Sequence, residues 1–288
     1  MNKLLIVIIF VAAILRFYQL GVNPPSLTWD EASLGYNAYS ILQTGADEYG
    51  NKFPISIRSF DDYKPALYTY LIVPFISMFG LNEFAVRIPS SLIGVLSILA
   101  IYFLVKELLQ KWDKKYQESI AVVSAFFLAI SPWHLQFSRA AFEGNIGLFF
   151  LITGLLFFFK ALRNGNFFYL SSILFLLSLY SYHSFRLFVP LFLLALFIIF
   201  FRGILNFKKQ AIISILILFL CSFPIWNSFL GTRTGTGARL SMVTIFSDPT
   251  VINPSIGRID YDQNNNDLLG SVLHNRRIVY SLAIAKGY

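Results

Sequence analysis

Residues 4–15 read LLIVIIFVAAIL, and residues 28–45, a short link later, read TWDEASLGYNAYSILQTG. The first stretch has no charged side chain, which suits the hydrocarbon interior of a bilayer. The second begins with two neighbouring carboxylates, Asp30 and Glu31. Long apolar runs recur along the chain, so the sequence predicts an all-α polytopic membrane protein whose first candidate site is this acidic pair.

The overall composition also indicates a membrane protein. Hydrophobic residues make up 56% of the 288 residues and charged residues only 13%, too few to cover a soluble domain of this length. The formal net charge is +8, but the basic residues lie in short links between apolar runs, where they set orientation and do not indicate nucleic-acid binding. With one cysteine, Cys221, neither a disulfide framework nor a thiolate metal site is expected.

Seven apolar runs approach the length that crosses a hydrocarbon core of about 30 Å. They lie at 3–20, 83–105, 118–133, 145–163, 167–181, 184–201 and 210–229. A shorter run at 65–79 is expected to re-enter or to pack without crossing, because the lysine-rich link 106–119 then lies on the cytoplasmic side with Lys3. Residues 1–229 are thus predicted to form one membrane-embedded module, and 230–288 a polar extracytoplasmic tail.

This topology places the polar clusters on the extracytoplasmic side, beginning with an outer loop at 21–64. Within that loop Thr28 and Glu31 have the spacing of a capping box, and apolar residues recur at helical intervals until Gly45. The pattern predicts an amphipathic helix over 29–44 that lies along the membrane interface.

The two carboxylates and two cations form the first set of candidate site residues. An ionised Asp30 at a helix N-terminus can accept a proton from a hydroxyl or bind a cation, and the alternative is that it and Glu31 only begin the helix. Lys64 precedes a proline at the mouth of an apolar run, where its ammonium could bind a lipid phosphate or simply extend toward the headgroups. Arg87 lies near the same boundary and is a second candidate for that anion.

The stretch 131–145, SPWHLQFSRAAFEGN, adds two more charges. Arg139 and Glu143 are four residues apart, which on one helix face allows an ion pair. The alternative is that Glu143 joins Asp30 around an acceptor or a metal ion. His134 is expected to have no functional role.

The stretch 179–190, LYSYHSFRLFVP, is an aromatic and basic turn between two apolar runs. Arg186 and His183 could close over a phosphate, and the tyrosines could contact a sugar. The alternative is an interfacial aromatic belt with an anchoring arginine.

The order of these stretches resembles the GT-C membrane glycosyltransferases. The nearest likeness is to the bacterial branch of the glycosyltransferase 39 type, akin to protein O-mannosyltransferases and the lipid A aminoarabinose transferase. It covers residues 1 to about 247 and rests on motifs in the same order: WDEASLGYNAYSILQTG, KPALYTYL, FGLNEFAVRIPSSLIGVL, SPWHLQFSRAAFEGN, YSYHSFRLFVPL and RLSMVTIFSD.

The resemblance implies an enzyme that passes a sugar from a polyprenyl-phosphate donor to a protein, lipid or glycan acceptor outside the plasma membrane. Direct displacement at the anomeric carbon would invert its configuration. The resemblance assigns Asp30 to activation of the acceptor, Glu31 to the second position of the acidic pair, and Lys64 and Arg87 to the lipid phosphate. Glu143 matches a metal-ligand position of related oligosaccharyltransferases, which leaves a cofactor, Mg²⁺ or Mn²⁺, open.

Two other functions are compatible with such a chain. A transporter or flippase for a lipid-linked or anionic substrate should carry polar or broken helices near the bilayer midplane, whereas the mid-span residues here are mostly Leu, Ile, Phe and Val. A membrane scaffold without enzymatic activity is the second alternative. Members of the resembled family are usually much longer, so the chain is expected to lack a C-terminal part.

Overall fold

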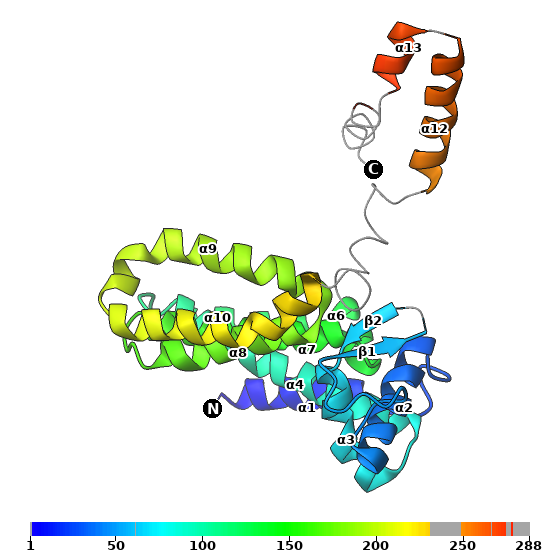
Figure 1. The fold of residues 1–288 in the computed structure, drawn as a ribbon. Helices are drawn as coiled ribbons and strands as arrows, with labels where there is room; N and C mark the ends of the chain where they lie inside the picture. The colour runs from blue at the N-terminus through cyan, green and yellow to red at the C-terminus, as the bar shows by residue number, and fades with distance from the viewer. Residues whose placement is uncertain (1, 61, 231–248, 266, 275–277, 279–288) are drawn as a thin grey trace. The chain divides into compact units, whose positions relative to one another are not determined.

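The computed structural model describes residues 2–60, 62–230, 249–265, 267–274 and 278, and it is mostly helical (Figure 1). By its internal contacts the chain divides into two compact units, Met1–Asn227 and Ser228–Tyr288. The larger unit carries every candidate site residue that the sequence analysis named. The motif at 239–248 lies outside the described residues.

The helices of the larger unit follow one another along the chain with short links. They are α1 (Lys3–Phe17), α2 (Trp29–Thr44), α3 (Leu67–Phe79), α4 (Glu83–Leu108), α5 (Lys114–Ile130), α6 (Pro132–Arg139), α7 (Glu143–Ala161), α8 (Phe167–Ser181), α9 (His183–Leu205) and α10 (Lys208–Leu230). Between α2 and α3 the chain forms a two-stranded antiparallel hairpin of β1 (Ser56–Ser59) and β2 (Asp62–Pro65). The smaller unit contains α12 (Pro249–Asn264) and α13 (Leu268–Leu273).

The predicted class, a mostly helical polytopic membrane protein, is confirmed. Among the described residues α4, α7, α9 and α10 are long and apolar enough to cross a bilayer, and α5 with α6, bent by 57°, makes a fifth span if the pair crosses as one. This is fewer than the seven predicted crossings. The runs at 3–20 and 167–181 form helices of 15 residues each, about 22 Å long at a rise of 1.5 Å per residue.

The outer-loop helix α2 has the bounds that the sequence predicts. Thr28 Oγ1 accepts the N–H of Glu31 at 3.3 Å, and the Glu31 carboxylate accepts the N–H of Thr28 at 2.9 Å, which completes the capping box. Gly45 ends the helix in the left-handed region with φ of 73°. Its apolar face is buried, with Leu34 and Ala38 fully covered.

Three apolar clusters hold the larger unit together. One joins α2, α3, α4 and β1 around Leu34, Ile57 and Tyr68, the second joins α1, α4 and α5, and the third joins α7, α8, α9 and α10. Figure 1 shows α2, α3 and the hairpin gathered at one end of the long helices. The short run at 65–79 therefore packs as α3 within the first cluster, and the candidate residues of the outer loop lie at that end.

Candidate functional site

Asp30 and Lys64 form an ion pair between an exposed carboxylate and a buried ammonium. The Asp30 side chain, in the first turn of α2, is 64% exposed, whereas that of Lys64 in β2 is 5% exposed. Lys64 lies opposite Ile57 in the hairpin, and because Ile57 is fully buried, this face of the hairpin turns inward. Within the described residues the structure gives Lys64 Nζ no hydrogen-bond partner, so Asp30 is what balances its charge.

Arg87, in the first turns of α4, is fully buried and uses all five of its N–H groups within the protein. Nε and Nη2 donate to the two carboxylate oxygens of Glu31 at 2.9 and 3.2 Å. The remaining N–H groups donate to backbone carbonyls of the link between α1 and α2, those of Leu20, Pro24 and Ser26. Because all five N–H groups of Arg87 donate to residues that the structure describes, none is left for a phosphate.

Glu31 is buried, and both oxygens of its carboxylate accept hydrogen bonds within the protein. Besides Arg87, it accepts the backbone N–H of Thr28 at 2.9 Å and that of Ala141 at 3.0 Å. Burial alone would raise the pKa of Glu31, but the hydrogen bonds from Arg87, Thr28 and Ala141 outweigh it and hold the pKa below its ordinary value. Glu31 and Arg87 thus bind α2, α4 and the link before α7 to one another.

The interpretation of Arg139 and Glu143 as neighbours on one helix face is wrong. Helix α6 ends at Arg139 and α7 begins at Glu143, so the chain between them is not helical. Arg139 donates to backbone carbonyls in the last turn of α1 and in the link that follows, those of Leu15, Tyr18 and Asn23, at 2.6–2.9 Å. Glu143 is buried in the first turn of α7.

His183 and Arg186 lie together beside the strand that carries Lys64. His183 Nε2 is 2.7 Å from the carbonyl oxygen of Tyr63, the residue before Lys64. A carbonyl can only accept, so Nε2 carries the hydrogen and Nδ1 can accept from Arg186 Nη1 at 3.5 Å. The turn between α8 and α9 is thereby held against β2.

Arg16 is a buried arginine that the sequence analysis did not single out. Its guanidinium donates to the carbonyls of Leu128 and Ala129, in the last turn of α5, and lies 2.8 Å from His134 Nδ1. The bend between α5 and α6 leaves those carbonyls without helical partners, and Arg16 satisfies them. An arginine after an apolar run is typical of a membrane boundary, so the sequence pattern alone did not distinguish this role.

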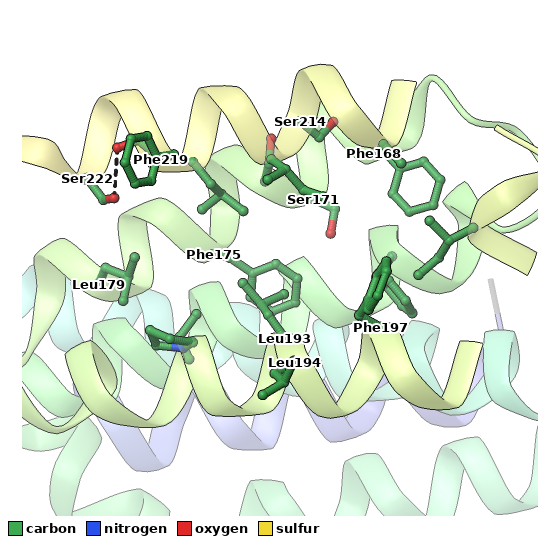
Figure 2. A pocket seen from close by; sticks show the side chains of 18 of the residues that line it. Phe168, Ser171, Phe175, Leu179, Leu193, Leu194, Phe197, Ser214, Phe219 and Ser222 are labelled. Carbon is green, nitrogen blue, oxygen red and sulfur yellow. Dashed lines mark hydrogen bonds between the residues drawn. The ribbon is translucent and has the colours of Figure 1, made fainter. Parts of the chain in front are cut away.

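An apolar cavity of about 380 Å³ lies between α8, α9 and α10 (Figure 2). Phe175, Leu193 and Phe219 are among the side chains that line it. Arg186 Nε donates to the carbonyl of Leu179, which also lines the cavity, at 3.4 Å. The turn between α8 and α9, with His183 and Arg186, therefore lies at one end of this apolar cavity.

The described residues contain no group of three or more His, Cys, Asp or Glu side chains arranged to hold a metal ion.

A comparison with protein-family models identifies the class. Residues 63–226, more than half of the chain, match the model of the dolichyl-phosphate-mannose-protein mannosyltransferases. The chain belongs to this family. A comparison with curated proteins gave no match.

The match to the mannosyltransferase family covers Lys64, Arg87, Glu143, His183 and Arg186, together with the residues that line the cavity. It confirms the resemblance to membrane glycosyltransferases of the GT-C type. The chain is a multi-pass membrane glycosyltransferase of the mannosyltransferase family, with a dolichyl- or polyprenyl-phosphate-linked sugar as donor.

Proposed function

We propose that this enzyme transfers the sugar of a polyprenyl-phosphate donor to a hydroxyl or amine of a protein, lipid or glycan on the extracytoplasmic face of the plasma membrane. The observation that carries the proposal is the Asp30/Lys64 pair. It places an exposed carboxylate, which an acceptor can reach, against an ammonium that suits a phosphate.

The arrangement around Lys64 supports a donor with a charged head and an apolar tail. His183 contacts the strand of Lys64 through the carbonyl of Tyr63, and Arg186 lies between His183 and the cavity. The phosphate would bind at Lys64 and Arg186, with His183 holding the two side by side, and the first part of the prenyl chain would enter the cavity between α8, α9 and α10.

The transfer needs a base at the acceptor and a cation at the leaving phosphate. The acceptor oxygen or nitrogen attacks the anomeric carbon, the bond from that carbon to the phosphate oxygen breaks, and Asp30 takes the acceptor proton. The polyprenyl phosphate leaves with its charge stabilised by Lys64. In the free protein Lys64 pairs with Asp30, so a donor phosphate would draw Lys64 toward itself and release the carboxylate for the acceptor. A single displacement inverts the anomeric configuration.

Glu31 and Arg87 have a different role in this proposal. Their donors and acceptors are occupied within the protein, so we assign both to positioning α2 and hence Asp30. Arg139 likewise holds the end of α6 to the last turn of α1 and to the link after it. Glu143 stays a candidate for contact with the acceptor or with Mg²⁺ or Mn²⁺.

A transporter or flippase is the second candidate function. The observation that favours it is the 57° bend between α5 and α6, with the buried Arg16 at the break, because broken helices occur at transporter binding sites. Transport needs two compartments, whereas transfer does not, and this difference separates the two candidates.

The test is sugar transfer in detergent from a panel of polyprenyl-phosphate sugars to membrane extracts, with and without a chelator, for wild type and Asp30→Asn. We expect transfer by the wild type, loss of transfer in a folded Asp30→Asn variant, and a product of inverted anomeric configuration. Sensitivity to the chelator would assign a divalent cation. Transfer by Asp30→Asn at the wild-type rate would exclude the role of Asp30. A wild type that is inactive with every donor but moves lipid-linked sugar across vesicles would favour the transporter.

A further inference from the structure

Two exposed aromatic rings lie beside the Asp30/Lys64 pair. Trp29, the first residue of α2, is 81% exposed, and Phe60, in the turn between β1 and β2, is 63% exposed. Their ring centroids are 6.2 Å apart at an interplanar angle of 58°. Trp29 directly precedes Asp30 in α2, and Phe60 lies in the turn of the hairpin that carries Lys64. Helix α2 and the hairpin therefore each supply one aromatic ring and one charge of the ion pair.

The backbone of Phe60 has an unfavourable conformation. Phe60 has φ of 56°, in the left-handed region that glycine adopts more readily than a bulky residue. Arg58 Nε donates to the Phe60 carbonyl at 3.1 Å and supports the turn. Phe53 shares the exposure and the positive φ, so the feature that distinguishes Phe60 is its pairing with Trp29 beside Asp30 and Lys64.

We propose that Trp29 and Phe60 form a stacking platform for a pyranose ring at the Asp30/Lys64 pair. This inference rests on the proposed function and deepens it. The C–H face of a sugar packs on aromatic rings, and its hydroxyl groups pair with a neighbouring carboxylate and ammonium. The platform has both chemistries within two adjacent elements. The ring that binds belongs either to the sugar of the donor or to a saccharide acceptor.

An exposed aromatic residue can also anchor a protein at the membrane interface. Phe53 provides the matched control, because it lies in the same outer loop, is 81% exposed and also has a positive φ, of 48°. An anchoring role predicts similar effects of Phe53→Ala and Trp29→Ala, whereas a sugar platform predicts an effect of Trp29→Ala and Phe60→Ala but not of Phe53→Ala.

The kinetic test compares Trp29→Ala, Trp29→Phe, Phe60→Ala and Phe53→Ala in the transfer assay, with kcat and KM measured for donor and acceptor separately. We expect Trp29→Ala and Phe60→Ala to raise one of the two KM values about tenfold, the loss of one good ring contact, with folding unchanged. Trp29→Phe should restore most of the wild-type KM. A rise for the donor assigns the platform to the donor sugar, and a rise for the acceptor assigns it to an acceptor saccharide. Equal KM values in Trp29→Ala, Phe60→Ala and Phe53→Ala would overturn the proposal.

A binding test does not depend on turnover. The chain has four tryptophans, so the difference in fluorescence between wild type and Trp29→Phe isolates the signal of Trp29. Titration with a panel of methyl hexosides and methyl pentosides should change that signal, and Phe60→Ala should weaken the change. A Trp29 signal that no glycoside alters would refute the platform even if transfer is observed. Glycoside binding without transfer from any donor would keep the platform and reject the proposed function.

Discussion

Asp30 and Glu31 are adjacent in the sequence and lie in opposite environments. The Asp30 side chain is 64% exposed and pairs with Lys64. Glu31 is buried and accepts two hydrogen bonds from Arg87 and two from backbone N–H groups. A helix turns by about 100° per residue, so neighbours at its N-terminus face different surroundings. One carboxylate is accessible to a substrate, and the other connects the elements that position it.

The environment of Glu31 predicts an acid-sensitive contribution to stability. Because the folded state holds the pKa of Glu31 below its ordinary value near 4.5, the contribution is present above that pH and is lost as the pH falls through the lower folded value. Glu31→Gln should lower the free energy of unfolding at neutral pH by about 3–5 kcal/mol, since it leaves Arg87 buried without its counter-charge. Thermal unfolding in detergent between pH 7 and pH 3 measures both effects.

The difference in melting temperature between wild type and Glu31→Gln should shrink as the pH falls below about 4.5. Glu83→Gln is the control, because Glu83 also lies in the first turn of a helix but is only half-buried. A gap between wild type and Glu31→Gln that stays constant over the whole pH range would contradict the account of this pair.

At the scale of elements, α4 and α6 approach closely because their contact residues are small. Ser90 and Ser91 of α4 donate to the carbonyls of Phe137 and Ser138 at 3.0 and 2.9 Å. Small residues let membrane helices come near one another, and polar ones supply hydrogen bonds between them. This crossing supports α6, whose end leads to the Ala141 N–H that binds Glu31.

Gly94→Ala tests that crossing. A Cβ at Gly94 would lie 2.6 Å from Ser138 Cβ and 3.1 Å from Arg16 Nε, so α6 has to shift. We expect a loss of about 1–3 kcal/mol in the free energy of unfolding, measured by thermal or chemical unfolding in detergent. Gly144→Ala is the matched control in the first turn of α7, where an added Cβ meets nothing within 4 Å. Equal stability of the two variants would argue against a tight crossing.

The sequence predicted local features of these elements well. The bounds of α2 follow from local signals at its two ends, the capping box of Thr28 and Glu31 at the start and Gly45 at the end. The hairpin was missed because its strands have four residues each, too few for a clear alternation.

Contacts between distant residues were beyond the sequence pattern. Glu31 and Arg87 are 56 positions apart, and nothing in either local stretch marks them as partners. The spacing of Arg139 and Glu143 suggested one helix face, but the break between α6 and α7 at 140–142 separates them. Candidate residue types were therefore easier to find than their roles.

At the scale of the whole larger unit, the turn with His183 and Arg186 contacts both the outer hairpin and the cavity between α8, α9 and α10. The family fixes the donor as a lipid-linked sugar, and the cavity offers an apolar space that such a lipid suits. Membrane-crossing runs were recognised from composition, but the number that crosses was not, because α1 and α8 are apolar and short.

Ser214→Phe should interfere with the donor. Ser214 is buried on α10 and is one of the side chains that line the cavity (Figure 2), so a phenyl group there takes up part of the space. We expect the KM for a long-chain donor to rise about tenfold and that for a donor with one or two isoprene units to change less. Ile213→Phe, one residue earlier on a more exposed part of α10, is the control. An unchanged KM for the long-chain donor would remove the prenyl chain from this cavity.

The central claim is that Asp30 acts on the acceptor and Lys64 on the donor phosphate, and single-turnover transfer from a radiolabelled donor tests both in one experiment. The account predicts that Asp30→Asn binds donor with near wild-type affinity and transfers its sugar at least about 100-fold more slowly, the usual range for loss of a general base. Lys64→Gln should instead lose most of its donor binding. Wild-type transfer by Asp30→Asn, or wild-type donor affinity in Lys64→Gln, would contradict the account.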